Sequence, residues 1–210
     1  MNYTLFIKNN FEYTKIMNTI KHCFYIEKEL PNNVFKNEYK KFLCEDFDLI
    51  LDEKFLENLK ILSKLSKDKY VILGILDKKN QSFYEHFGCF NVIKIPIDIT
   101  NKEFEEIIDF EPQKEYQSVR YCYNKIIYLS QSEDWIIYCD REFEISILAL
   151  KNNYDIEHLK TLLPRWISIE ETIETYLSPM FTVMPKFLKS LNMSKTDLKK
   201  TLIKNYTNLL

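Results

Sequence analysis

The chain has 210 residues, of which 46% are hydrophobic and 29% are charged, and its formal net charge is −2. This balance allows a buried core beneath a solvated surface and excludes intrinsic disorder. The low net charge provides no overall attraction to nucleic acid or anionic lipid. The chain contains two glycines, Gly74 and Gly88, which excludes the glycine-rich motifs of dinucleotide-binding folds, P-loop enzymes and nucleophile-elbow hydrolases. We therefore expect a globular protein that carries no cofactor.

No segment predicts export or membrane insertion. Residues Met1–Asn10 lack the continuous apolar stretch and the small-residue cleavage site of a secretory signal. The longest apolar runs, such as Tyr70–Leu76, are far shorter than the roughly 20 residues that cross a bilayer. The cysteines form no C-x-x-C pair, and we interpret them as reduced, buried small hydrophobes: Cys23, Cys44, Cys89, Cys122 and Cys139. A cytoplasmic protein without membrane contact is expected.

The first half of the chain predicts helices and strands in alternation. Phe11–Cys23 and Val34–Cys44 have apolar residues in helical register. Asp46–Leu51 is then predicted as a strand, Glu53–Lys67 as an amphipathic helix, and Tyr70–Leu76 as a fully apolar strand. A strand buried on both faces is typical of a parallel sheet covered by helices. This order therefore predicts a parallel β-α-β unit.

Strand signals continue through the middle of the chain. Phe90–Ile97 predicts a third strand, in which Pro96 indicates a strand end or a sheet edge. Three further segments predict an antiparallel meander, with a loop at Ser130–Asp134 and a tight reversal at Asp140-Arg141: Tyr121–Leu129, Trp135–Cys139 and Glu142–Leu148. The tail of the last segment, Leu148–Leu150, fits the start of a helix equally well.

Three capping boxes predict helix starts, because in each a hydroxyl residue precedes an acid by three positions: Thr100 and Glu103, Ser168 and Glu171, Ser194 and Asp197. The first of these helices is expected to end near Phe110, and the second before Pro179. The third has Leu198, Leu202 and Tyr206 along one face.

These elements predict an α+β fold with a mixed β-sheet, parallel at the start and antiparallel later, covered by helices. We expect residues 1–210 to form a single domain, with a soft boundary near residues 151–154 before a helical C-terminal part. The most apolar strands should supply the core, including Val71, Leu73, Ile93, Trp135 and Ile137.

Metal-ligating residues are sparse in the sequence. His86 and Cys89 are three residues apart, but two ligands do not make a zinc site. His22 and Cys23 are adjacent and are expected to diverge on a helix, and His158 stands alone. We therefore expect no bound metal, while a Cys-His nucleophile pair assembled in space stays open.

The densest group of residues suited to recognition surrounds the predicted reversal: Trp135, Tyr138, Asp140, Arg141 and Glu144. An ion-pair network of Asp140, Arg141 and Glu144 would lock the hairpin, and Trp, Tyr and Arg are also the residue types enriched at binding hot spots. Together with Ile145 these residues spell W-x-x-Y-x-D-R-x-x-E-I, which resembles an element of small bacterial immunity-type proteins. Those proteins neutralise a polymorphic or contact-dependent toxin, so the resemblance implies stoichiometric protein binding without catalysis.

Charge is distributed unevenly along the chain. Asp98 to Glu144 contains twelve acids and five bases, whereas Lys186 to the end contains six lysines and one acid. Such runs are often ordinary solvated helix faces. The functional interpretation is an acidic face that contacts a basic toxin, such as a nuclease, through candidate residues of the first run: Glu105, Glu106, Asp109 and Glu111.

We thus expect a non-catalytic inhibitor of a toxin protein, and not a nucleic-acid partner. Two alternatives stay open. One is an enzyme on an unrecognised scaffold, which requires a pocket with convergent polar groups. The other is a nucleic-acid-associated regulator that uses the lysine-rich end.

Overall fold

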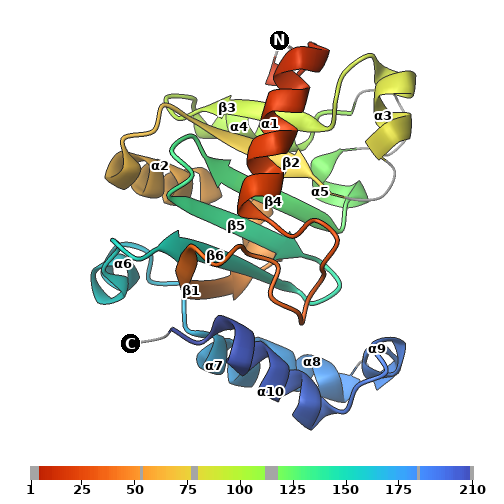
Figure 1. Ribbon diagram of the computed structural model, residues 1–210, viewed down its shortest axis with the longest axis vertical. Helices are drawn as coiled ribbons and strands as arrows, with labels where there is room; N and C mark the ends of the chain where they lie inside the picture. The colour runs from red at the N-terminus through yellow and green to blue at the C-terminus, as the bar shows by residue number, and fades with distance from the viewer. Residues whose placement is uncertain (1–4, 53, 77–79, 112–117, 184, 209–210) are drawn as a thin grey trace.

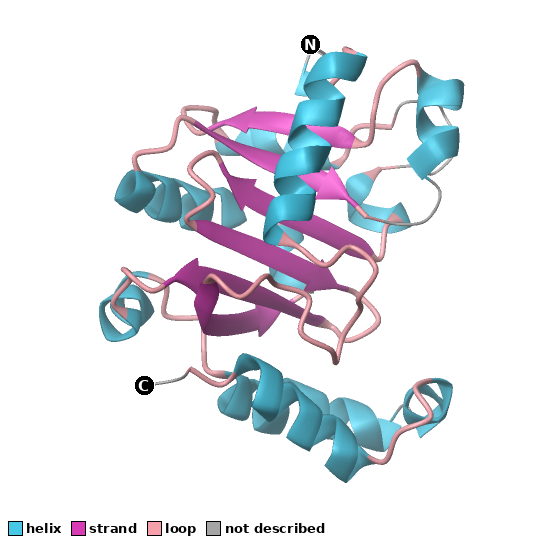
Figure 2. Cartoon of the chain, in the orientation of Figure 1, coloured by secondary structure: helices cyan, strands magenta, loops and turns pink. Residues whose placement is uncertain are grey.

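The computed structural model describes residues 5–52, 54–76, 80–111, 118–183 and 185–208. A single six-stranded sheet lies between two layers of helices, and the fold is α+β (Figures 1 and 2). The strand order is β1-β6-β5-β4-β2-β3. The strands are β1 (Tyr39–Asp46), β2 (Tyr70–Ile75), β3 (Val92–Pro96), β4 (Lys125–Ser130), β5 (Trp135–Asp140) and β6 (Ile145–Lys151).

Both faces of the sheet are apolar, because side chains alternate between them along each strand. In β5, Trp135 and Ile137 point into one core, and Ile136 and Tyr138 point into the other. We call these cores the first face and the second face. Burial on both sides explains why the central strands are apolar throughout and do not alternate between polar and apolar residues.

Helices cover each face. The first face is covered by the 3₁₀ segment η2 (Asp48–Leu51), α2 (Phe55–Ser66), α3 (Asn80–Phe87), α4 (Asn101–Ile108), α5 (Val119–Cys122) and α6 (Ile156–Leu162). The second face is covered by α1 (Asn10–Cys23), which crosses the front of the sheet in Figure 1, and by the C-terminal helices. The latter pack beside β1 and β6: α7 (Ile169–Thr172), η3 (Ile173–Leu177), α8 (Ser178–Val183), α9 (Pro185–Ser190) and α10 (Lys195–Tyr206).

The prediction of a parallel β-α-β unit is wrong, and the sheet is not mixed. β2 pairs antiparallel with both β3 and β4, and every pairing between the named strands is antiparallel. The segment Asp46–Leu51 is mainly the 3₁₀ turn η2, and the strand before it is Tyr39–Asp46, at the far edge of the sheet. The same strand replaces the helix predicted for Val34–Cys44. Its apolar residues Phe42, Leu43 and Cys44 are consecutive because they serve both cores.

The later strands were predicted more accurately. The meander is confirmed as β4, β5 and β6, and Leu148–Leu150 belongs to β6 and not to a helix. β3 is an edge strand that ends at Pro96, as expected. All five predicted core residues, Val71, Leu73, Ile93, Trp135 and Ile137, are fully buried.

The capping boxes at Thr100 and Ser168 are confirmed, with both reciprocal hydrogen bonds present in each. Ser194 caps α10 through the amide of Asp197, but its hydroxyl donates to the Asp197 carboxylate, which replaces the reciprocal backbone bond. The predicted helix end before Pro179 is wrong. A π-helical turn, Ile173–Leu177, precedes the proline and lets the helix continue into α8, because the wider turn accommodates the missing amide donor.

No helix among the described residues combines the length and the apolarity that crossing a membrane requires.

Candidate functional site

The hairpin between β5 and β6 holds the residues that sequence reasoning selected for recognition. Trp135, Tyr138 and Asp140 are at most 2% exposed, so a partner cannot reach them without unfolding the sheet. The Trp135 indole N–H donates to Ser66 Oγ at 3.1 Å and thereby joins the strand to α2. A surface role for these three residues is therefore wrong, because the helices on both faces bury the strand that carries them.

Asp140 organises the turn after β5. Its Oδ1 accepts hydrogen bonds from the amides of Glu142 and Phe143 at 3.0 and 3.4 Å, and its Oδ2 accepts one from the Tyr138 hydroxyl at 3.3 Å. Burial raises the pKa of Asp140 to about 6, although Lys125 acts in the opposite direction. These bonds give the carboxylate a structural role in the reversal.

Arg141 is partly exposed, but its guanidinium is directed inward. Nε donates to the carbonyl of Tyr123 at 3.3 Å and Nη2 to that of Arg120 at 2.5 Å, while Cζ lies 4.7 Å from the centre of the Phe47 ring. Glu144 is exposed and has a left-handed φ of +54°. Within the described residues no ion pair links Asp140, Arg141 and Glu144, so the predicted network is wrong. Carbonyl and amide groups satisfy these side chains instead.

The acidic candidates of α4 have a different environment. Phe104, Ile107 and Ile108 bury the inner face of the helix against the first face of the sheet. Acids occupy its outer side and its two flanks, all of them exposed or partly exposed: Asp98, Glu103, Glu105, Glu106, Asp109 and Glu111. From residue 98 to 111 the only base is Lys102. We call these six acids the α4 acidic surface.

One base outside the helix neutralises part of this surface. Arg120 Nε lies 2.5 Å from Asp109 Oδ1, and its Nη1 donates to the carbonyl of Leu51 at 2.6 Å. The hydrogen bond with Asp109 raises the pKa of Arg120. Asp109 thus fastens α5 to α4. Glu105, Glu106 and Glu111 form no ion pair among the described residues.

The twelve acids of the central segment do not form one face. Glu133 and Asp134 lie in the turn before β5, whereas Glu142 and Glu144 lie in the turn after it, at the opposite end of the strand. Glu133 contacts α1 on the second face, while α4 covers the first. Glu115 lies outside the described residues.

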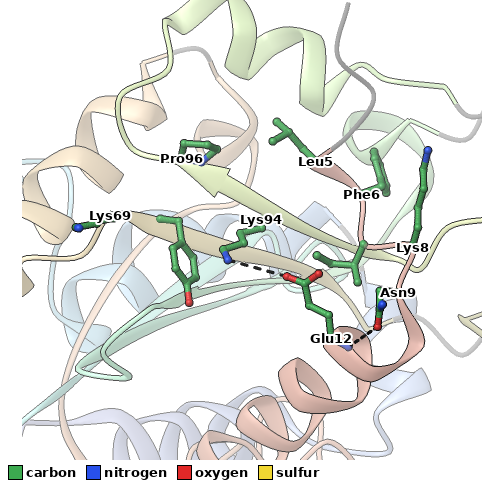
Figure 3. Close-up of a pocket in the computed structure, with 10 residues that line it drawn as sticks. Leu5, Phe6, Lys8, Asn9, Glu12, Lys69, Lys94 and Pro96 are labelled. Atoms are coloured by element: carbon green, nitrogen blue, oxygen red, sulfur yellow. Dashed lines mark hydrogen bonds and ion pairs between the residues drawn. The ribbon is translucent and has the colours of Figure 1, made fainter.

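A pair of hollows lies between α1 and the neighbouring strands, and both are lined by Glu12, Tyr70 and Lys94. The larger has a volume of about 500 Å³, and Figure 3 shows Lys94 directed toward Glu12 across it, at 4.0 Å. The smaller, of about 460 Å³, ends at Glu133. The polar side chains of the larger hollow are Lys, Asn, Glu and Tyr, which supply charge and hydrogen bonds without a cysteine, serine or histidine nucleophile.

A buried ion pair lies beneath the C-terminal helices. Glu45 in β1 is fully buried, and Arg165 Nε lies 2.9 Å from its Oε1. Neither carboxylate oxygen has hydrogen-bonding geometry with a described donor. Burial raises the pKa of Glu45 to about 7, and Arg165 offsets part of that rise. No feature of the sequence around Glu45 indicated this pairing, because Arg165 is distant in the chain.

Cysteine and histidine positions bear on metal and nucleophile chemistry. Cys23, Cys44, Cys89 and Cys139 are buried and unpaired, and burial raises the pKa of Cys23 and Cys44 to about 12, which disfavours a nucleophilic thiolate. The side chain of His86 lies outside what the structure describes, so its predicted pairing with Cys89 has no structural account. His22, Cys23 and Glu133 form the one group of three metal-ligating side chains found among the described residues. Sequence reasoning missed it because Glu133 is distant in sequence.

Comparison with known proteins assigns this chain to no family. No family model and no solved structure matches this chain. A stretch of 88 residues, or 42% of the chain, is 28% identical to histone deacetylase 9 of Arabidopsis thaliana and spans only 20% of that protein.

Proposed function

We propose that this chain is a non-catalytic, cytoplasmic inhibitor of immunity type, which binds a basic toxin domain through the α4 acidic surface. One observation supports the proposal most directly. Six acids and a single lysine lie between residues 98 and 111, on α4 and on the residues that flank it, and the apolar side chains of α4 are buried in the core. The acids of α4 itself, Glu103, Glu105 and Glu106, are therefore held at the surface by a helix that is packed on the sheet.

Electrostatics make such a surface suitable for a basic partner. Glu103 caps α4 and Asp109 pairs with Arg120, but Glu105, Glu106 and Glu111 form no ion pair among the described residues. Exposed charges contribute little to folding, so these three acids are not explained by stability. A concentrated field of one sign accelerates association with a partner of the opposite sign and selects against others. A nuclease domain, which must itself bind phosphates with basic residues, fits this description.

The buried hairpin narrows the proposed contact. Because Trp135, Tyr138 and Asp140 are buried, we assign the partner contact to acids with exposed or partly exposed side chains, in particular Glu105, Glu106 and Glu111. We propose no deacetylase activity, because the likeness to the Arabidopsis protein spans a fifth of that protein. Buried, unpaired cysteines are consistent with the proposed cytoplasmic location.

The experiment first looks for a basic toxin domain in the neighbouring genes, whose absence would count against the immunity function. It then co-expresses that domain with this chain and measures the association kinetics of the purified pair. We expect the triple change Glu105→Lys, Glu106→Lys and Glu111→Lys to slow association about tenfold or more at low salt and to reduce protection. Asp109 is left intact because its bond to Arg120 is structural.

A matched control reverses three exposed acids elsewhere in the chain, Glu27 and Glu38 in turns and Glu85 in α3, and so changes the net charge equally. This control should associate and protect as the unchanged protein does. Equal protection by the α4 variant would refute the acidic contact, and failure of the unchanged protein to protect would refute the immunity function.

A further inference from the structure

The end of α1 and the turn between β4 and β5 bring three metal-ligating side chains together. His22 Nδ1 lies 3.1 Å and Cys23 Sγ 3.7 Å from the same carboxylate oxygen, Glu133 Oε2. The three ligand atoms all lie within 4.8 Å of one another. Adjacent helix residues point about 100° apart, yet a carboxylate that lies between them contacts both. His22 and Cys23 were expected to diverge on a helix, but the fold places Glu133 within reach of both.

The spacing of the three atoms fits zinc. Zinc binds imidazole nitrogen at about 2.0–2.1 Å, thiolate sulfur at about 2.3 Å and carboxylate oxygen at about 2.0–2.2 Å, in tetrahedral geometry. Tetrahedral angles then place the ligand atoms about 3.4–3.6 Å apart. Two separations, 3.1 Å from His22 Nδ1 and 3.7 Å from Cys23 Sγ to Glu133 Oε2, are close to these values. The third, between His22 Nδ1 and Cys23 Sγ, is at most 4.8 Å, so a rotation of the exposed His22 side chain would complete the geometry.

We propose that His22, Cys23 and Glu133 bind one zinc ion, with water in the fourth position. Imidazole, thiolate and carboxylate are the three ligand types that zinc uses in proteins. The Cys23 thiol is buried, whereas the His22 side chain is 70% exposed, so the ion enters from the histidine side and the open position faces solvent. Binding releases the thiol proton to water, because the thiolate is the ligand.

The backbone at Glu133 supports a role for its side chain. Glu133 has a left-handed φ of +61°, a conformation in which glycine or asparagine is the usual residue. The buried Tyr39 hydroxyl donates to its carbonyl at 2.9 Å and fixes this turn residue beneath the end of α1. Glu38 adds a second carboxylate that acts electrostatically on Cys23, so the local charge favours a cation.

The bound ion would join α1 to the β4–β5 turn across more than 100 residues of sequence. Its position on the second face separates it from the α4 acidic surface on the first. Zinc binding at this site can therefore be tested separately from partner binding at the α4 acidic surface.

The test uses the purified full-length chain, stripped of metal with a chelator and titrated with ZnCl₂ by calorimetry. We expect one zinc ion per chain and a higher melting temperature, because an ion that binds the folded chain stabilises it by mass action. Titration with Co²⁺ should give a thiolate-to-cobalt charge-transfer absorption, which reports coordination by cysteine.

Two variants identify the ligands. His22→Ala alters an exposed side chain and Glu133→Gln retains the turn residue, so neither threatens the fold, and each should weaken zinc binding at least tenfold. His158→Ala, at an exposed histidine of α6, should bind as the unchanged chain does. The proposal is overturned if the unchanged chain binds no zinc, if cobalt gives no thiolate absorption, or if the His22 and Glu133 variants keep full affinity.

Discussion

Asp140 determines the conformation of the β5–β6 turn through hydrogen bonds. Removing the carboxylate by Asp140→Ala leaves two backbone amides and the Tyr138 hydroxyl without their acceptor in a buried site. We expect a loss of about 1–3 kcal/mol in the free energy of unfolding, since unsatisfied buried polar groups carry that cost. Asp140→Asn keeps one oxygen acceptor, so its free energy of unfolding should decrease less than that of Asp140→Ala. Urea denaturation measures both, and equal effects of Ala and Asn would contradict the hydrogen-bond account.

Glu45 gives the stability of the protein a pH dependence. Its pKa rises from the ordinary 4.5 to about 7 on folding, chiefly because the side chain is buried. Between those values the folded chain keeps a proton that the unfolded chain has lost, so the free energy of unfolding falls as pH rises from about 4.5 to about 7. Below pH 4.5 the contribution of protonated Glu45 to the free energy of unfolding is fully present, and above about pH 7 that contribution is lost.

The variant Glu45→Gln cannot titrate and should show a shallower decline across this range. Some decline should persist, because the pKa of Asp140 is also raised, to about 6, and acts in the same direction. Denaturant titrations at several pH values measure the slope. Glu27→Gln, at an exposed site, is the control, and a slope in Glu45→Gln as steep as in the unchanged protein would count against the assignment to Glu45.

Elements with local signals were predictable from the sequence. Thr100 and Ser168 mark the starts of helices because each satisfies amides of its own first turn. The meander followed from short loops between apolar strands, which leave antiparallel pairing as the only geometry. The rule that a proline ends a helix failed at Pro179. The π-helical turn before it, whose Ile173 and Leu177 are buried in the second-face core, lets the helix continue.

Strand direction was not predictable from apolarity alone. Continuous apolar strands such as β2 indicate cover on both faces, and parallel sheets are the usual case. Here two helical layers cover an antiparallel sheet, because the crossover connections, from β1 through α2 to β2 and from β3 through α4 and α5 to β4, join strands that are not neighbours in the sheet. Contacts between distant segments, such as Glu45 with Arg165 and His22 with Glu133, could not be predicted from the sequence. The residues next to each partner in the chain form no motif that points to the other partner.

At the scale of the whole molecule, both faces share one sheet, which predicts that they unfold together as one domain. Both tryptophans, Trp135 and Trp166, lie in the first-face core, whereas Leu202 of α10 is fully buried in the second. Leu202→Ala should cost about 2–5 kcal/mol and lower the melting temperature by roughly 4–20 °C. If the chain unfolds as a single cooperative unit, tryptophan fluorescence should show the lower melting temperature of Leu202→Ala, although both indoles lie on the other face of the sheet.

The matched variant Leu73→Ala removes an equally buried leucine from the first face and should shift the same transition. Circular dichroism, which reports all helices, should give the same midpoint as fluorescence in each variant. If Leu202→Ala lowers the midpoint seen by circular dichroism but leaves that of fluorescence unchanged, the C-terminal helices unfold separately and the chain comprises two units. β1 and β6 share the second-face core with α10, β1 pairs with β6, and β6 pairs directly with β5, so Leu202→Ala should destabilise the sheet itself.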